Sequence, residues 1–239
     1  MIFGTIWLSW SLLSTPGIGI DRTLYMSATE RWLSGGGFYL PDQLTGPYVI
    51  HLGIARDVLY PPILLWLTVP LFYLPPILWW AIPMGATMWG LIRLRPAPWT
   101  WPLILGLALF PASWLQFAWG GPSMWVLAFG ALGAAYGWPA VLILIKPTLA
   151  PFALFGANHR SWWAALGILA LLSLPFGTMW LDWIRAAVVN PTNGGFMYSW
   201  AYVPAMCVPV VAWLGRRPAD RPVGRCGQRP ASNPKPAEW

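Results

Sequence analysis

Long apolar runs, separated by short stretches rich in glycine, proline or charge, make up most of this 239-residue chain. The first run covers residues 2–20, and nineteen residues of α-helix, at about 1.5 Å each, just cross a hydrocarbon core of about 30 Å. Seven more runs are candidate spans: 59–73, 75–92, 101–117, 122–137, 139–157, 161–180 and 200–214. The pattern predicts an all-α, polytopic membrane protein with about eight transmembrane helices, and the proline and glycine breaks leave seven or nine open.

One long polar stretch, residues 21–62, interrupts this pattern. Within it, residues 22–34 repeat apolar positions with helical spacing, and the side chains of Leu24, Tyr25 and Ala28 fall on one face. We expect a short helix lying in the membrane interface. The three glycines at 35–37 should end it, because glycine readily adopts the left-handed conformation of a helix C-terminus.

Composition and charge support a membrane location. Hydrophobic residues make up 57% of the chain and charged residues 9%, with a mean hydropathy of +0.56. Much of the net charge of +7 comes from six basic residues after the last run: Arg216, Arg217, Arg221, Arg225, Arg229 and Lys235. Such a cluster is typical of contact with anionic lipid rather than nucleic acid. We therefore predict a membrane domain at 1–215, with an outward loop at 21–58, and a disordered basic cytoplasmic tail at 216–239.

The basic tail also sets the predicted orientation. Lys and Arg favour the cytoplasmic side, so eight spans place both termini in the cytoplasm of a multi-pass plasma-membrane protein. The loops 21–58 and 181–199 then face outward and residues 158–160 face inward. Arg93 and Arg95 also face outward in this count, which disagrees with the tendency of basic residues to lie on the cytoplasmic side. The first run has no basic residue before it and no small-x-small cleavage site, so we interpret it as a retained span.

Two charged residues, one directly after an apolar run and one inside another, are candidates for chemistry. Asp21 directly follows the first run, where partial loss of water would raise its pKa toward that of a general base. The alternative is an N-cap for the next helix. Lys146 is a charge inside an apolar run and is followed by Pro147, so it needs an anionic partner, a water-filled cavity or a snorkelling conformation. The two cysteines, the two histidines and the glycines form no metal, nucleophile or phosphate-loop motif, so we expect no metal ion and no cofactor.

The order of these features resembles a known superfamily. Asp21 after the first span, Tyr25 before a glycine turn, Leu59-Tyr60-Pro61-Pro62, and later Lys146-Pro147 are similar to polyprenyl-phosphate-sugar-dependent glycosyltransferases of the GT-C superfamily. The nearest group is glycosyltransferase family 87, the polyprenol-phosphate-mannose-dependent mannosyltransferases. The resemblance covers roughly residues 15–157.

The resemblance implies an enzyme that moves a sugar, mannose in the nearest group, from a polyprenyl phosphate to a glycan or glycolipid acceptor on the outer face, with inversion. It implies Asp21 as general base and Lys146 as the cation that offsets charge on the donor phosphate. Three weaker candidates for that phosphate are Arg22, Arg56 and Arg185. Tyr60, Pro61 and Tyr25 would line the donor groove.

The chain departs from the family pattern at Gly121 and Thr148, where the family usually has glutamine, and it lacks the further spans of other members. Two alternatives therefore stay open beside the enzyme: a non-enzymatic lipid-binding or accessory membrane protein, and an inactive truncated glycosyltransferase. A transporter is a third, less supported, because Lys146 has no visible proton-relay partner.

Overall fold

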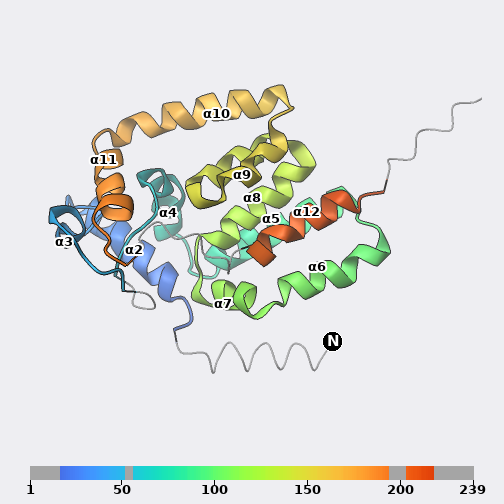
Figure 1. Cartoon of the computed structure of the whole chain (residues 1–239), viewed down its shortest axis with the longest axis horizontal. Helices are drawn as coiled ribbons and strands as arrows, with labels where there is room; N and C mark the ends of the chain where they lie inside the picture. Colours follow the sequence, from blue (N-terminus) through green and yellow to red (C-terminus); the bar gives the residue numbers. More distant parts are fainter. Residues whose placement is uncertain (1–16, 52–55, 194–202, 218–239) are drawn as a thin grey trace, which may run out of the picture.

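A computed structural model describes residues 17–51, 56–193 and 203–217 (Figure 1). Within these ranges the regular structure is helical, apart from two isolated β-bridges, which confirms the all-α prediction. The α-helices are α2 (Ile20–Leu33), α3 (Pro41–Thr45), α4 (Leu65–Phe72), α5 (Leu78–Leu94), α6 (Trp101–Ala108), α7 (Pro111–Trp119), α8 (Ser123–Tyr136), α9 (Ala150–Ala153), α10 (Arg160–Ser173), α11 (Met179–Ile184) and α12 (Val203–Leu214). The 3-10 segments are η1 (Pro62–Leu64), η2 (Pro98–Thr100), η3 (Trp138–Ile145), η4 (Pro147–Leu149), η5 (Leu154–Gly156) and η6 (Leu174–Phe176), and η7 (Arg185–Val189) is a π-helix.

Most of the first predicted span, residues 2–16, lies outside the described residues, as do the tail from residue 218 and residues 200–202 of the last span. By length and composition, none of the helices in the described ranges could cross a membrane alone. Two bent pairs reach the required length and apolarity: 98–108 with 111–119, bent by 62°, and 160–176 with 179–189, bent by 94°.

Helix α2 forms as predicted. Leu24, Tyr25 and Ala28 are buried in one hydrophobic cluster, and the helix ends before Gly35, whose φ of +82° is left-handed. The N-cap, however, is Gly19, with φ of +72° and no side-chain cap. Asp21 lies inside the first turn, so its alternative role as the N-cap is wrong.

The predicted span 139–157 is wrong as a single crossing, because the chain doubles back at Lys146. Segment η3 runs along α8, and η5 returns to its start, so that a methyl group added at Gly156 would lie 2.1 Å from the Gly137 carbonyl oxygen. Only glycine allows such a close approach of two backbones. We call residues 138–156 the Lys146 hairpin.

The predicted span 59–73 is also shorter than a crossing. Its helical part is η1 plus α4, and both ends lie against α2: the Tyr60 ring contacts Tyr25 edge-on, and Leu71 packs in a cluster with Met26. Proline at the start of η1 and again inside α4 limits the helix.

The structure also changes the predicted position of Arg93 and Arg95 relative to the basic tail. Arg95 and Arg217 lie together, because the Arg217 amide donates to the Arg95 carbonyl at 3.3 Å and Pro96 forms a β-bridge with Arg216. The expectation that Arg93 and Arg95 lie opposite the start of the basic tail is therefore wrong.

The base of the Lys146 hairpin lies at the same end of the molecule as Arg95 and Arg217. The Phe155 ring lies 5.6 Å from Trp213 near the end of α12, and His159 lies against Gly137. Helix α10 begins and α12 ends toward the right of Figure 1, whereas α2, α3 and α11 lie at the left. The acidic residues within the described ranges, Asp21, Glu30, Asp42, Asp57 and Asp182, are all on α2, α3, α11 or the loop before Tyr60. The described acidic residues are thus confined to one end of the molecule.

Candidate functional site

The Asp21 carboxylate lies against a glycine turn that joins α7 to α8. A methyl group added at Gly121 would lie 2.8 Å from Asp21 Oδ2, so the carboxylate occupies space that any other residue at 121 would fill. The turn is held by two tryptophans of α5: Trp79 donates to the Gly120 carbonyl at 2.7 Å and Trp80 to the Phe117 carbonyl at 3.0 Å. The rigid turn therefore positions Asp21.

Burial controls the charge of this carboxylate. Loss of water raises the pKa of Asp21 from 3.8 to about 6, and the positive charge of Lys146 acts against this rise. Asp21 and Lys146, 125 positions apart in the sequence, are thus close enough to interact electrostatically. A carboxylate with this pKa is ionised at neutral pH and still basic enough to accept a proton, as a general base requires.

Lys146 lies at the tip of the hairpin and is 7% exposed. Its ammonium donates to Ser123 Oγ at 2.8 Å and lies 5.4 Å from the centre of the Tyr60 ring. The Tyr60 hydroxyl is itself 3.5 Å from Ser123 Oγ. Three separate elements, the hairpin, the start of α8 and the segment before η1, therefore meet around one cation.

The predicted groove residues belong to this assembly. Tyr25 is buried and meets Tyr60 edge-on, with ring centres 5.3 Å apart. Pro61 is buried and precedes η1, and the Tyr60 carbonyl accepts a hydrogen bond from the Tyr39 hydroxyl at 2.9 Å. Tyr60 is thus held by its backbone while its ring lies between Tyr25 and Lys146.

The three candidate arginines have different surroundings. Arg22 follows Asp21 and is half-buried, and its Cβ lies 3.3 Å from the position of a methyl group at Gly120. Burial lowers the pKa of its guanidinium, and its buried Nε has no hydrogen-bond partner among the described residues. Arg56 pairs with Asp42, and Arg185 lies 3.6 Å from Asp182 and is exposed. The structure therefore brings Arg22 to the site and gives the other two carboxylate partners elsewhere.

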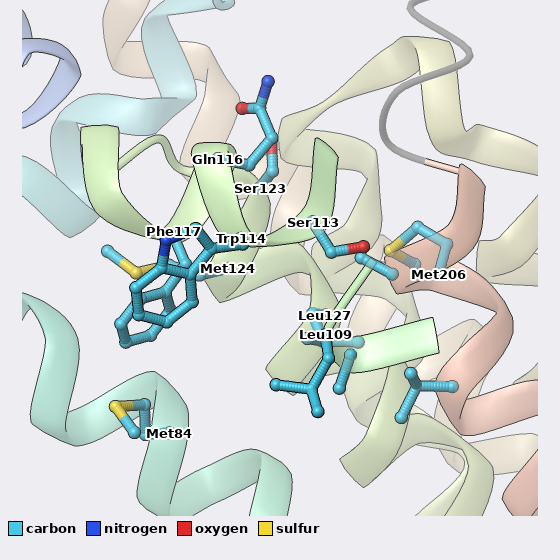
Figure 2. Close-up of a pocket in the computed structure, with 13 residues that line it drawn as sticks. Met84, Leu109, Ser113, Trp114, Gln116, Phe117, Ser123, Met124, Leu127 and Met206 are labelled. Atoms are coloured by element: carbon cyan, nitrogen blue, oxygen red, sulfur yellow. The ribbon is translucent and has the colours of Figure 1, made fainter. Parts of the chain in front are cut away.

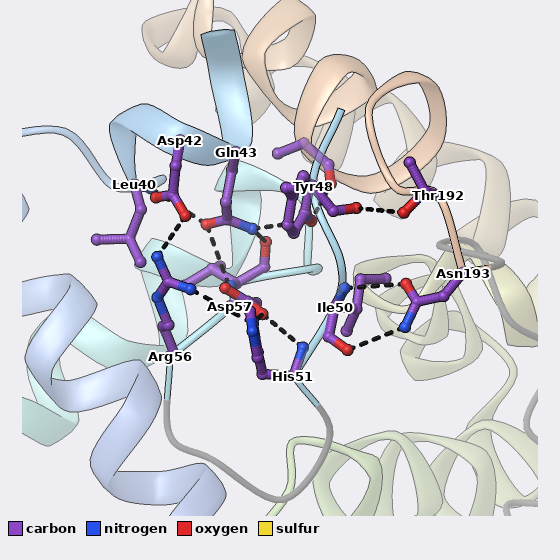
Figure 3. Close-up of polar contacts among 12 residues, drawn as sticks. Leu40, Asp42, Gln43, Tyr48, Ile50, His51, Arg56, Asp57, Thr192 and Asn193 are labelled. Atoms are coloured by element: carbon purple, nitrogen blue, oxygen red, sulfur yellow. Dashed lines mark hydrogen bonds and ion pairs between the residues drawn. The ribbon is translucent and has the colours of Figure 1, made fainter. Parts of the chain in front are cut away.

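Arg56 belongs to a polar network in the loop between α3 and η1 (Figure 3). Asp57 is buried and accepts a hydrogen bond from the His51 backbone amide at 2.8 Å. Gln43, fully buried, donates to the Val58 carbonyl and the Tyr48 hydroxyl. This network gives the loop a fixed conformation just before Tyr60.

The same loop is attached to the segment after η7. The Tyr48 amide donates to the Asn190 carbonyl at 3.0 Å, and the Ile50 backbone exchanges two hydrogen bonds with the Asn193 side chain (Figure 3). The loops 21–58 and 181–199, which the sequence places on one side of a membrane, are therefore in contact through their described residues.

An apolar cavity of about 230 Å³ opens beside the site, between α5, α7, α8 and α12 (Figure 2). Apolar side chains such as Met84, Leu127 and Met206 line most of it. Gln116 and Ser123 lie at the upper end of the view, away from Met84, and Ser123 is the residue that accepts from Lys146. The cavity therefore reaches the neighbours of the Asp21–Lys146 pair.

Sequence reasoning missed Gln116 and Ser123. Gln116 Oε1 is buried and has no hydrogen-bond partner in the described part of the chain. Gln116 Oε1 lies 3.3 Å from the position that a methyl group at Gly121 would take, and Asp21 Oδ2 lies 2.8 Å from the same position. A polar side chain inside the apolar run 101–117 was the available signal, because such residues in apolar helices tend to be functional.

Within the described ranges, no group of three or more His, Cys, Asp or Glu side chains could hold a metal ion. The sequence matches no protein-family model, no curated protein and no solved structure. The site combines a carboxylate of raised pKa, a buried lysine and an adjoining apolar cavity.

Proposed function

We propose that this chain is a polytopic membrane glycosyltransferase that moves a sugar from a polyprenyl phosphate to an acceptor hydroxyl. The observation that carries the proposal is the position of a carboxylate of raised pKa, Asp21, close enough to the buried Lys146 side chain for their charges to interact. A base and a fixed cation are the two groups that displacement of a phosphate by an alcohol requires.

The reaction balances with these residues. Asp21 takes the proton from the acceptor hydroxyl as that oxygen forms a bond to the anomeric carbon. The bond between the anomeric carbon and the phosphate oxygen breaks, and the lipid phosphate leaves with the electron pair. Lys146, and more weakly Arg22, offsets the charge that develops on this phosphate, since a fixed cation acts strongly in a site with little water. Attack opposite the leaving group inverts the anomeric centre.

The surface supports a membrane location. Large apolar side chains are exposed along α5, α6 and α10, including Trp89, Leu105 and Leu171. Such extensive apolar exposure is unusual for a soluble protein. The end that gathers Arg95 and Arg217 has the charge of a cytoplasmic face, and the end with Asp21 would then face outward, in the plasma membrane.

Of the eight apolar runs in the sequence, six, counting residues 2–20, remain candidate crossings in this topology, and the other two return to the side they enter from. Both termini stay cytoplasmic, as the sequence predicts. The Lys146 hairpin enters from the cytoplasmic side, and its tip reaches the site from that side.

A second candidate is lipid binding without transfer. The apolar cavity beside Ser123 favours it, because cavities with such linings take hydrocarbon. Lys146 would then hold a lipid phosphate that is never displaced, and Asp21 would have no role as a base.

Sugar transfer by the purified protein separates these candidates. The protein in detergent or lipid nanodiscs is incubated with radiolabelled polyprenyl-phosphate-mannose and with methyl mannoside as acceptor. We expect labelled product of inverted anomeric configuration, and a loss of about 10²- to 10⁴-fold in rate for Asp21→Asn. Tight lipid binding without product supports the second candidate, and undiminished transfer by Asp21→Asn removes Asp21 from the mechanism.

A further inference from the structure

The ends of α5 and α12 are joined by a short antiparallel backbone pairing. The Ala97 amide donates to the Gly215 carbonyl at 2.8 Å, and the Arg217 amide donates to the Arg95 carbonyl at 3.3 Å. This register sets Arg95 directly opposite Arg217, and side chains that are directly opposed in an antiparallel pair start about 5 Å apart on the same face. The two guanidinium groups therefore belong to one patch of surface, although they come from distant parts of the sequence.

Arg95 has an unusual backbone conformation. Its φ of +50° and ψ of +56° are left-handed, and within the described ranges no other residue except glycine has a positive φ. This conformation is strained for a residue with a Cβ atom, and glycine, the usual residue at such a helix end, would relieve the strain. An arginine at this position lowers the stability of the fold, which indicates that its side chain has another role.

Two further arginines lie on tryptophan rings beside this pairing. Arg93 Cζ is 4.8 Å from the centre of the Trp89 ring, and Arg216 Cζ is 4.5 Å from the centre of the Trp213 ring. A third indole, Trp99 on η2, is 67% exposed. Tryptophans gather where a membrane protein meets the lipid headgroups. The guanidinium groups at this end therefore lie at the depth of lipid phosphates.

Four exposed arginines make up this surface, which we call the arginine cluster: Arg93, Arg95, Arg216 and Arg217. Among the described residues, the ion pairs join aspartates to His51, Arg56 or Arg185, and none of them includes the cluster. The described acidic residues are all near the opposite end of the molecule. Like charges held side by side repel each other, so an anion from outside the described chain would stabilise this arrangement.

We propose that the arginine cluster binds the headgroup of a phospholipid with two phosphodiester groups, such as cardiolipin, and that this lipid links the ends of α5 and α12. A guanidinium group binds phosphate through two parallel N–H bonds, so four of them suit two phosphates better than one. The sequence indicated lipid contact for the basic tail in general. The structure adds two arginines from α5 and a defined headgroup. This inference rests on the proposed membrane location and not on the transfer reaction.

The test measures lipid binding by the full-length protein in detergent, after its lipids have been exchanged for phosphatidylcholine. Cardiolipin and phosphatidylglycerol are compared at equal total phosphate by microscale thermophoresis, and native mass spectrometry counts the bound lipids. We expect one cardiolipin per chain, bound at least about 10-fold more tightly than phosphatidylglycerol, because the second phosphate of a bound headgroup is already in place. Equal binding of the two lipids would mean a general attraction of charge and would overturn the proposal.

A matched pair of variants separates the cluster from surface charge in general. Arg95→Gln should weaken cardiolipin binding by about 10- to 100-fold, since it removes a charged hydrogen-bond donor to phosphate. The control is Arg160→Gln, which removes an exposed arginine at the start of α10, toward the end of the molecule where α12 ends (Figure 1). It should weaken binding by at most about 5-fold, the effect of a nearby surface charge. An equal loss in both variants would count against a defined site.

Arg95→Gly guards against a variant that binds poorly because it folds poorly. Relief of the strained backbone should make it melt roughly 2–4 °C above wild type without cardiolipin. Added cardiolipin should then raise its melting temperature less than that of wild type, because a phosphate contact is missing. Misfolding cannot produce both results. A cardiolipin response as large as that of wild type would show that the Arg95 side chain does not bind the lipid.

Two further outcomes concern the nature of the ligand and the independence of this site. Inorganic pyrophosphate offers two phosphates without a hydrocarbon chain, and full displacement of cardiolipin by an equal concentration of it would assign the cluster to a soluble diphosphate instead. Binding is measured without any sugar donor. Failure of the lipid test therefore leaves the transfer proposal standing, and absence of transfer leaves cardiolipin binding standing.

Discussion

Replacing Asp21 by asparagine should make the protein more stable and less active at the same time. The rise in the pKa of Asp21 from 3.8 to about 6 means that the folded protein holds the ionised form at a disadvantage of about 3 kcal/mol. This is the net effect of burial and of the opposing charge on Lys146. Asparagine has nearly the same shape and no charge, so Asp21→Asn escapes this cost.

The sign of the pH dependence follows from proton binding. An acid with a higher pKa in the folded than in the unfolded state binds its proton more tightly when folded, so stability falls as pH rises between about 4 and 6. The full cost is present above that range. Asp21→Asn should therefore melt above wild type at pH 8, by roughly 6–12 °C for about 3 kcal/mol, and match it near pH 4.

Thermal melting of the detergent-solubilised protein, followed by tryptophan fluorescence across this pH range, measures the difference. Asp42→Asn is the control, because Asp42 forms a surface pair with Arg56 and its removal should cost at most about 1 kcal/mol. An Asp21→Asn variant that melts at or below wild type at pH 8 would refute the argument that the carboxylate is held ionised against its burial. The transfer assay on the same preparations should show the loss of rate.

Three further predictions concern the same region. Lys146→Met removes the charge that lowers the pKa of Asp21, so the midpoint of kcat/KM against pH should rise above about 6, and an unchanged midpoint would contradict the pairing. Gly121→Ala places a methyl group 2.8 Å from Asp21 Oδ2 and should cut transfer by about 10- to 100-fold with little change in melting temperature; full activity would show that the carboxylate position is not critical. Thr29→Val leaves the buried Thr68 hydroxyl without its partner at 2.7 Å and should cost about 1–3 kcal/mol in chemical denaturation, whereas the double valine variant should cost less.

Local signals in the sequence predicted local structure well. Helix α2, its buried face around Leu24 and Ala28, and its end at the glycines follow from helical spacing and from the conformational freedom of Gly35. The pairing of Asp21 with Lys146 was expected only from the order of motifs. No periodicity links positions so far apart.

The two returning segments could not be predicted from hydropathy. An apolar run has the same composition whether it crosses a bilayer or doubles back, and the difference lies in contacts between distant residues. The Lys146 hairpin depends on Gly156 touching Gly137, and the short α4 depends on packing against α2. The charges of Arg93 and Arg95 were the one sequence signal against the predicted arrangement of these runs, because the structure places Arg95 beside Arg217.

Gln116 was overlooked for a similar reason. Its run is apolar on average, and the single amide becomes significant only when the fold places it beside Gly121, which is in contact with Asp21.

Because the base of the Lys146 hairpin is closed, the position of the Lys146 side chain does not depend on the length of the chain outside the hairpin. Because Gly137 and Gly156 are in contact, the distance from base to tip depends only on the residues between them. Insertions or deletions in the connection at Ala157–His159 would leave the depth of the ammonium unchanged. A change of even one residue within 138–145 would move it. Among relatives of this chain, length variation should therefore be tolerated after Gly156 but not within the hairpin before it.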